Sequence, residues 1–361
     1  MKLFKKLAAV YSGSHAEAPM RQYIKRWVRS SVPNVKIEED AVGNLYLTKG
    51  QAETYPCLAA HMDQVQQPYP KDYKVVETAD IVFGYSPSQR RQCGLGADDK
   101  CGIWIALKML KQHEILKVAF FIAEEVGCKG SSQANMEFFS DVRFVVQADR
   151  RGAHDLITDI GFCDICSEDF VIATEAELFG YKEETGMMTD VEALKENGLG
   201  VSCINLSCGY CDPHTEREYV VKRDMINALN FVNHIIEKCV DVYPHEFSQY
   251  DRYADYYSYY GRGKWRKKNG EELEEAKLEE FYEQYETARE YISFEIEENP
   301  NITAQEFIAS YGQTLNLLRV EDIEDIIAEL QDESLYDDGY DWKNQLSSHS
   351  TQTTKNNGQI K

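Results

Sequence analysis

Up to about residue 240, short apolar runs alternate with amphipathic stretches along the chain. The runs 57–61, 143–149 and 201–207 have the length and composition of buried strands. Segments with helical periodicity, such as 99–113 and 223–240, lie between and after them. Strands that alternate with helices form βαβ units, in which helices cover both faces of a largely parallel sheet. We therefore expect an α/β fold: a three-layer sandwich around a mostly parallel, mixed sheet.

The chain changes character near residue 240. The segment 250–260 contains six tyrosines in eleven residues, and residues 241–361 carry 27 acidic against 12 basic side chains. Apolar residues at helical spacing indicate helices there, and Thr303 with Glu306 forms a capping-box pattern. The last fifteen residues have the polar composition of a disordered terminus. We expect a catalytic domain over residues 1–240 and an acidic, Tyr-rich, partly helical extension over 241–361.

The whole chain is acidic, with 61 Asp and Glu against 39 Lys and Arg and a formal net charge of −22. Such a charge repels phosphates, so neither nucleic acid nor an anionic membrane is an expected partner. The N-terminus has a short apolar stretch after its lysines, and no segment reaches the roughly 18 apolar residues of a membrane span. Ten cysteines are scattered without the spacing of a secreted disulfide scaffold. We expect a soluble, cytoplasmic protein whose thiols are mostly free.

The apolar run 117–123 ends on two adjacent carboxylates, Glu124 and Glu125. The run is too short for a typical helix and predicts a strand that leaves the core. Neighbouring side chains on an extended segment point in opposite directions, so we expect the two acids to act in different ways. Taken alone, an acidic pair after a strand is usually a solvated turn.

Other predicted strand ends also carry imidazole or carboxylate groups. These residues are His61 and Asp63, Asp98 before a helix, Asp149, and His214 after the last strand. In an open parallel sheet, ligands bind at the carboxyl ends of the strands. No predicted strand end carries a serine nucleophile elbow or a glycine-rich phosphate loop. Nitrogen and oxygen ligands without thiolate suit a divalent metal, above all zinc, with cobalt or manganese as alternatives.

The motifs H-x-D, G-A-D-D-K-x-G, E-E, D and H follow one another in this order along the chain. This order resembles the co-catalytic di-zinc exopeptidases, which include peptidase T, glutamate carboxypeptidases and bacterial leucyl aminopeptidases. The resemblance covers residues 8–235, where YSGSHAEAPMRQYI resembles the opening helix and EEDAVGNLYLTKG an early strand pair of that family.

Many members of this family carry an inserted lid or dimerisation domain. Here 34 residues separate Asp63 from Asp98, and 64 residues separate Asp149 from His214. We therefore expect no such inserted domain in this chain.

The resemblance implies a metal ligand set of five residues. His61 and Asp149 would bind one of two divalent metal ions, Glu125 and His214 would bind the other, and Asp98 would bridge them.

Two further carboxylates are implied as catalytic. Asp63 would stand behind His61, fixing its tautomer and raising its basicity. Glu124 would act as the general base, taking a proton from the water shared by the metals and passing it to the leaving amine. The implied activity is metal-dependent hydrolysis of a peptide bond in short peptides.

The expected lack of an inserted domain favours an aminopeptidase, because in the carboxypeptidase branch that domain helps to bind the substrate carboxylate. A carboxypeptidase and an amidohydrolase acting on N-acylated amino acids would use the same ligands and base, and both remain alternatives. A third alternative is a non-catalytic metal-binding module whose acidic extension docks a partner protein or a second copy of the chain. The segment 250–260 is a candidate cover for an open site.

Two C-x-x-C pairs suggest a competing tetrathiolate zinc site: Cys163 with Cys166, and Cys208 with Cys211. Their separation of 41 residues exceeds the common spacing of about 15–20, which disfavours this interpretation.

Asp190 stands at a predicted helix start, where N-capping competes with a role behind the ligands or at the substrate. Arg150 and Arg151 follow a predicted ligand, where pairing with local acids competes with binding of a substrate carboxylate. We interpret the remaining histidines as structural or surface residues: His15, His113, His154, His234 and His245.

Overall fold

The computed structural model of this 361-residue chain describes residues 1–160, 163–246 and 302–311, with Ala288, Ile292 and five positions between 320 and 327. The chain divides into two units, Met1–Tyr257 and Ser258–Lys361. The predicted extents 1–240 and 241–361 remain predictions. The candidate cover 250–260 and the final fifteen residues lie outside the described residues. None of the described helices is both long and apolar enough to cross a membrane.

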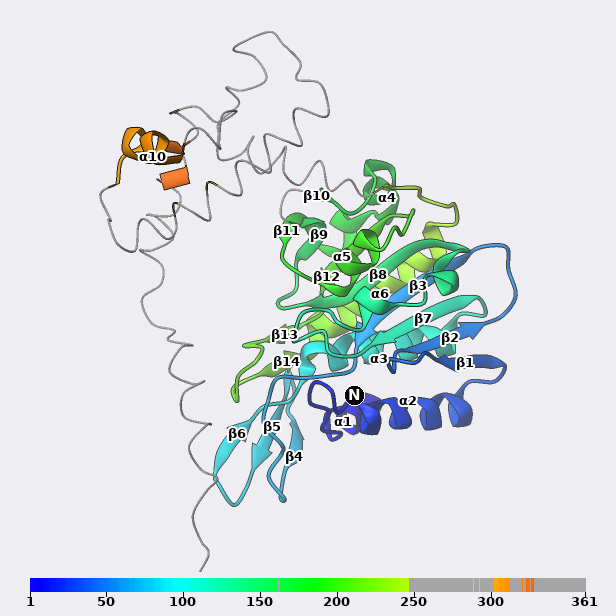
Figure 1. Cartoon of the computed structure of the whole chain (residues 1–361). Helices are drawn as coiled ribbons and strands as arrows, with labels where there is room; N and C mark the ends of the chain where they lie inside the picture. Colours follow the sequence, from blue (N-terminus) through cyan, green and yellow to red (C-terminus); the bar gives the residue numbers. More distant parts are fainter. Residues whose placement is uncertain are drawn as a thin grey trace, which may run out of the picture. The chain divides into compact units, whose positions relative to one another are not determined.

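A mixed sheet of nine strands forms the centre of the first unit (Figure 1). Its order is β1 (Val35–Glu39), β2 (Leu45–Lys49), β7 (Leu116–Phe121), β3 (Tyr55–His61), β8 (Val142–Arg150), β12 (Cys203–Ser207), β9 (Asp155–Ile160) and β10 (Cys163–Asp164), with β11 (Lys182–Gly186) paired to β9. The four central strands β7, β3, β8 and β12 run parallel to one another. Their carboxyl ends therefore lie along one edge of the sheet.

Helices cover both faces of this sheet. One face packs against α1 (Lys2–Ala8), α2 (Ala18–Ser31), α3 (Ala97–Gln112), α4 (Glu168–Thr174), η3 (Ala176–Phe179) and α6 (Lys222–Lys238). The other packs against α5 (Asp190–Glu196), η1 (Ser131–Gln133) and η2 (Met136–Phe139). Successive residues of β3 alternate between the two cores, since Leu58 joins the first and Ala59 the second. The predicted three-layer α/β sandwich with a mixed sheet is confirmed.

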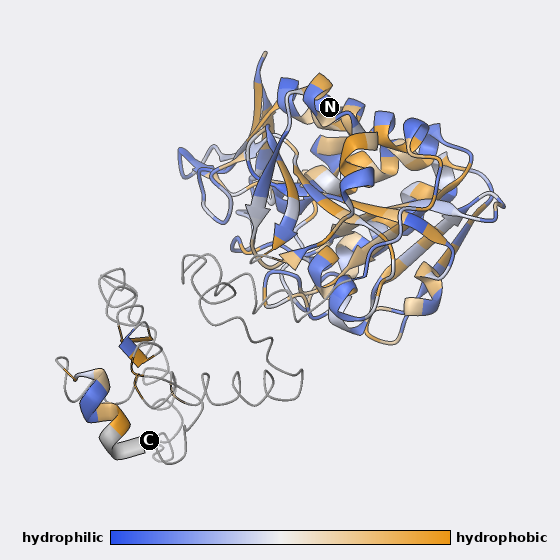
Figure 2. Ribbon diagram, turned by 90° about the horizontal axis from the view of Figure 1, so that it is seen from above, coloured by the Kyte–Doolittle hydropathy of each residue, from blue (hydrophilic) through white to orange (hydrophobic). Residues whose placement is uncertain are grey.

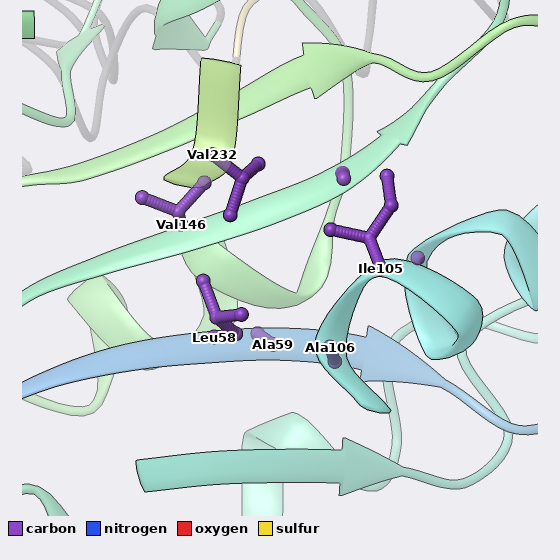
Figure 3. A pocket seen from close by; sticks show the side chains of 8 residues that line it. Leu58, Ala59, Ile105, Ala106, Val146 and Val232 are labelled. Atoms are coloured by element: carbon purple, nitrogen blue, oxygen red, sulfur yellow. The ribbon is translucent and has the colours of Figure 1, made fainter. Parts of the chain in front are cut away.

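The packing of α3 against the sheet fixes the helix that carries Asp98. Ile105 of α3, Leu58 of β3, Val146 of β8 and Val232 of α6 converge between the helices and the sheet (Figure 3). Figure 2 shows helices of the first unit that carry orange apolar and blue polar residues side by side, as expected for helices with one buried face.

A second, smaller sheet joins two segments that are far apart in the sequence. It consists of β4 (Lys74–Glu77), β5 (Ile81–Ser86), β6 (Arg91–Cys93), β13 (Tyr210–Cys211) and β14 (Tyr219–Val221). The 34-residue segment between Asp63 and Asp98 supplies β4 to β6, and the chain around His214 supplies β13 and β14. This sheet therefore connects the segment that precedes Asp98 with the segment that carries His214.

In the second unit, α10 (Ala304–Tyr311) begins with the predicted capping box. The Thr303 backbone N–H donates to Glu306 Oε2 at 3.0 Å, and the Glu306 N–H donates to Thr303 Oγ1 at 3.3 Å. Ala288 and Ile292 also have helical backbone and are buried, in agreement with the predicted periodicity.

Candidate metal centre

Three central strands, the start of α3 and the connection between β13 and β14 bring the five predicted ligand residues together. One group consists of His61, Asp98 and Asp149, and a second consists of Asp98, Glu125 and His214. Within each group the candidate ligand atoms all lie within 4.8 Å of one another. Across the described part of the chain, no other group of three His, Cys, Asp or Glu side chains has this spacing. Asp98 belongs to both groups.

The two carboxylate oxygens of Asp98 face different imidazoles. Its Oδ1 lies 3.0 Å from His61 Nε2, and its Oδ2 lies 3.2 Å from His214 Nε2. His61 Nε2 is also 3.6 Å from Asp149 Oδ1, and His214 Nε2 is 2.9 Å from Glu125 Oε2. The His61 side chain is fully buried, whereas that of His214 is 49% exposed. Solvent therefore reaches the centre at His214.

The start of α3 directs Asp98 into the centre. Gly96 caps this helix with a φ of 62°, and the backbone at Asp98 and Asp99 is non-helical, with a cis peptide bond between the two residues. The buried carboxylate of Asp99 accepts hydrogen bonds from the N–H groups of His61 at 3.2 Å and Gly102 at 2.8 Å. Asp99 thus attaches the end of β3 to the first turn of α3.

The strand that precedes Glu124 and Glu125 ends earlier than predicted. It ends at Phe121 instead of residue 123, because Ala123 adopts a φ of 50° and its N–H donates to Glu17 Oε1 at 3.1 Å. The two glutamates therefore lie on a loop, and the argument from strand alternation was wrong for them. Their side chains still diverge: Glu125 contacts His214, and Glu124 Oε2 lies 3.9 Å from His61 Nε2.

The crowding of carboxylates shifts several pKa values in the protein without bound metal. Burial, followed by repulsion from Asp98, raises the pKa of Asp149 well above its ordinary value. Burial raises the pKa of Glu124 to about 8, although attraction to His61 opposes the shift. Hydrogen bonds to Asp98 and then to Glu125 raise the pKa of His214 to about 10. The raised pKa values favour bound protons on Asp149, Glu124 and His214, and these protons reduce the repulsion between carboxylates that a bound cation would otherwise reduce.

The residues present fit a pair of divalent metal ions. Two imidazoles and three carboxylates form a nitrogen and oxygen donor set of the kind that zinc accepts. The buried Oε1 of Glu125 has no hydrogen-bond partner among the described residues, although a buried carboxylate oxygen normally has one. A cation beside Glu125 would satisfy this oxygen.

Asp63 lies directly behind this centre. Its Oδ1 is 3.3 Å from His61 Nδ1, although the angle does not complete a hydrogen bond. Asp63 accepts hydrogen bonds from Ser14 Oγ at 2.7 Å and from the N–H groups of Glu124 at 3.1 Å and Glu125 at 3.3 Å. Asp63 therefore connects His61 with the loop that carries both glutamates. The sequence analysis did not identify Ser14.

Asp190 is buried but does not cap its helix. The N-cap of α5 is Thr189, so the N-capping interpretation of Asp190 was wrong. Its carboxylate accepts hydrogen bonds from Ser131 Oγ at 2.6 Å and Gln147 Nε2 at 3.2 Å. Gln147 Nε2 also donates to Asp149 Oδ2 at 3.2 Å. The sequence analysis missed Gln147, although a polar residue inside the apolar run 143–149 was an available signal.

The remaining candidates lie outside both ligand groups. Arg150 pairs with Asp155 at 3.1 Å, which agrees with the local interpretation of this arginine. All ten cysteines are free, and no cysteine belongs to either group. The described contacts of three other histidines are His113 with Asn233, His154 with the Gly180 carbonyl and His234 with Glu175.

Comparison with known proteins gives one partial sequence match. No family model matches the chain. A protein from Pyrobaculum aerophilum named as a LysW-lysine/LysW-ornithine hydrolase is 36% identical over 83 residues, which is 23% of this chain and 23% of that protein. The matched part thus spans less than a quarter of the relative.

The fold matches solved structures over a larger share of the chain. Aminopeptidase PepT from Bacillus cereus superposes with a TM-score of 0.54 at 15% identity, covering 66% of this chain and 97% of that one. An aminopeptidase from the archaeon Desulfurococcus kamchatkensis superposes with a TM-score of 0.53 at 18% identity, covering 66% and 94%. The chain therefore has the fold of these aminopeptidases, in agreement with the exopeptidase family that its motifs resemble.

Proposed function

We propose that this chain is a metal-dependent exopeptidase that removes residues from the amino terminus of short peptides. The observation that carries the proposal is the position of Asp98, whose two oxygens face His61 and His214 in two adjoining ligand groups. A carboxylate shared by two adjoining ligand groups can bridge a pair of metal ions, as a two-metal hydrolytic mechanism would use.

In this proposal His61 and Asp149 hold one ion, Glu125 and His214 hold the other, and Asp98 bridges them. We propose zinc for both positions, with cobalt or manganese as alternatives. Two such ions would polarise the scissile carbonyl and lower the pKa of a water towards about 7.

Glu124 is the proposed general base. Its side chain is 12% exposed and lies beside His61 at the edge of the centre. Burial raises its pKa to about 8 in the metal-free protein, and divalent ions beside it would lower that pKa, so that the carboxylate could accept a proton at neutral pH. Glu124 would accept a proton from the attacking water and deliver it to the leaving amine.

Asp63 supports this chemistry without contact with the substrate. Its Oδ1 lies 3.3 Å from His61 Nδ1, and in the metal-loaded protein it would accept the Nδ1 proton and leave Nε2 free to face the centre. Its hydrogen bonds to the N–H groups of Glu124 and Glu125 would keep the base and one ligand at a fixed distance from His61.

Aminopeptidase action is favoured because both solved structures described above are aminopeptidases. The hydrolase relative, whose named substrates contain lysine or ornithine, supports a second candidate: hydrolysis of N-acylated amino acids. A cytoplasmic location is part of the proposal, since ten free thiols suit a reducing compartment. Docking of a partner protein or a second copy by the extension stays a prediction.

A substrate panel tests the proposal. The zinc-loaded chain is offered free di- and tripeptides, the same peptides with an acetylated amino terminus, the same peptides with an amidated carboxyl terminus, and N-acetyl amino acids. We expect cleavage of the free and amidated peptides and none of the acetylated compounds. Cleavage that requires a free carboxylate would identify a carboxypeptidase, and cleavage of N-acetyl amino acids alone would identify an amidohydrolase. Bound zinc without turnover of any compound would favour the non-catalytic module.

A further inference from the structure

A buried hydrogen-bond chain lies behind the ligands and connects three segments that carry them. Its charged ends are Lys100, two residues after Asp98, and Glu218, four residues after His214. Lys100 is 1% exposed and Glu218 is fully buried. Buried charges of this kind are rare unless they are paired or hydrogen-bonded.

Two glutamines connect the opposite charges. Lys100 Nζ donates to Gln64 Oε1, Gln64 Nε2 donates to Gln66 Oε1 at 3.2 Å, and Gln66 Nε2 donates to Glu218 Oε2 at 3.1 Å. Both glutamines follow His61 and Asp63 in the chain, and both are buried. We call these four residues the Lys100–Glu218 relay.

Glu218 also holds the backbone at the start of α3. Its Oε1 accepts the N–H of Asp98 at 3.2 Å, and its Oε2 accepts the N–H of Leu95 at 3.0 Å. A carboxylate at a helix N-terminus is well placed to accept such otherwise unpaired donors. The proposed bridging aspartate is therefore attached to the segment of the proposed ligand His214.

Two glycines leave the space that the relay occupies. A Cβ atom at Gly94 would lie 2.2 Å from Gln66 Cγ, and one at Gly96 would lie 2.6 Å from Lys100 Nζ and 2.7 Å from Gln64 Cδ. Gly96 also has a φ of 62°, a conformation that favours glycine. In the stretch G-L-G-A-D-D-K, only Asp98 is a candidate metal ligand. The relay explains the two glycines and the lysine of the same stretch.

We propose that Glu218 is a positioning residue of the metal centre: through Asp98 and the relay, it sets the spacing between the His61 half and the His214 half. The inference rests on the proposed two-metal function. It does not assign Glu218 any contact with metal or substrate. The relay fixes three separate segments to one another at the point where their ligands must meet.

The test compares Glu218→Gln with a matched control. In Glu218→Gln an amide N–H₂ must face either the Asp98 N–H or the donors of Leu95 and Gln66, and Lys100 loses its compensating charge. The control is Glu216→Gln, which removes the same charge two residues away. Glu216 also accepts a backbone N–H, from Gly94 at 3.3 Å, but its side chain is 42% exposed.

Each variant is titrated with zinc against a chelating indicator, and its cobalt-loaded form is examined by visible absorption. We expect Glu218→Gln to bind one of two ions about tenfold or more weakly and to change the cobalt spectrum. Glu216→Gln should match the wild type in both measurements. Wild-type affinities and an unchanged spectrum in Glu218→Gln would overturn the inference.

The double variant Lys100→Met/Glu218→Gln distinguishes a loss of zinc affinity caused by unfolding from one caused by a misplaced Asp98. Removing both charges avoids the unpaired buried ammonium, so its thermal midpoint should recover towards the wild type. Its zinc affinity should stay low, because the Asp98 N–H still lacks its carboxylate. Wild-type affinity in the double variant would contradict a positioning role. A wild type that binds no zinc would instead overturn the proposed function and this inference together.

Discussion

Nδ1 of His61 lies 3.3 Å from Oδ1 of Asp63, and both side chains are fully buried. Replacing Asp63 by Asn removes the negative charge behind the imidazole and disturbs the acceptor for the Glu124 and Glu125 N–H groups. We expect zinc affinity to fall about 10- to 100-fold in Asp63→Asn, as measured by competition with a chelator. Ser14→Ala, which removes one hydrogen bond to Asp63, should have a smaller effect. Equal zinc affinity in Asp63→Asn and wild type would contradict this role.

Zinc binding should release protons. Hydrogen bonds to Asp98 and Glu125 raise the pKa of His214 to about 10 in the metal-free protein, so its imidazole is charged at neutral pH. A metal needs the neutral imidazole, and its apparent affinity should therefore rise with pH towards about 9, where hydroxide begins to compete for aqueous zinc. Calorimetry at pH 7.5 in two buffers of different ionisation enthalpy should reveal a net release of at least about one proton. Zinc binding without net proton release would contradict the prediction.

The raised pKa of His214 also makes the stability of the metal-free fold depend on pH, in the opposite direction to zinc affinity. A raised pKa in the folded state stabilises the fold fully below the ordinary histidine value of about 6.5. This contribution is lost as the pH rises through the folded value of about 10. The difference in thermal midpoint between metal-free wild type and His214→Ala should therefore shrink between these two pH values. A difference that grows with pH would contradict the assignment.

Lys195 stabilises the end of the first unit. Its ammonium group, on a side chain that is 1% exposed, donates to the carbonyls of Leu199 at 2.8 Å, Val201 at 3.0 Å and His245 at 2.6 Å. Lys195→Met leaves three carbonyls without this donor, so we expect the free energy of unfolding to fall by about 2–4 kcal/mol in urea titrations. Lys36, in an exposed pair with Glu38, is the control and should change stability by less than about 0.5 kcal/mol on mutation to Met. Equal effects of the two variants would contradict this account.

The thiols provide a test of the competing cysteine zinc site. All ten cysteines are free, nine are buried, and Cys211 is partly exposed. A thiol reagent should therefore react rapidly with about one group in the native protein and with all ten after unfolding. Cys211→Ser should remove the rapid reaction without loss of bound zinc. Loss of zinc in this variant would revive the tetrathiolate interpretation.

Three ligand residues, His61, Glu125 and Asp149, stand at or just after apolar runs that predict strands, whereas Asp98 and His214 were assigned from the ordered motifs that resemble the exopeptidase family. Parallel strands such as β3 and β8 place His61 and Asp149 at one edge once the fold class is known. The second sheet gave no such signal: β5 pairs with β14, more than 130 residues later, through Phe83 and Tyr219. Long-range pairing of this kind depends on tertiary contacts that local periodicity does not encode.

Burial also separates residues that look alike in sequence. Glu216 and Glu218 stand two positions apart in the same polar stretch, yet Glu218 is fully buried and Glu216 has an exposed side chain. Only the approach of Leu95 and Asp98 from another segment distinguishes the two residues. The predicted end of the strand before Glu124 was wrong for a similar reason. Glu17, from a distant segment, accepts the N–H of Ala123 and stabilises the left-handed backbone there.

The central claim is that Glu124 acts as a base beside a metal centre that forms without it. The most direct measurement is zinc content by mass spectrometry together with kcat for a cleaved free peptide, in wild type and in Glu124→Gln. The account predicts two zinc ions in both proteins and a kcat that is lower by about 10²- to 10⁴-fold in the variant. Unchanged kcat in Glu124→Gln, or loss of zinc together with activity, would contradict it.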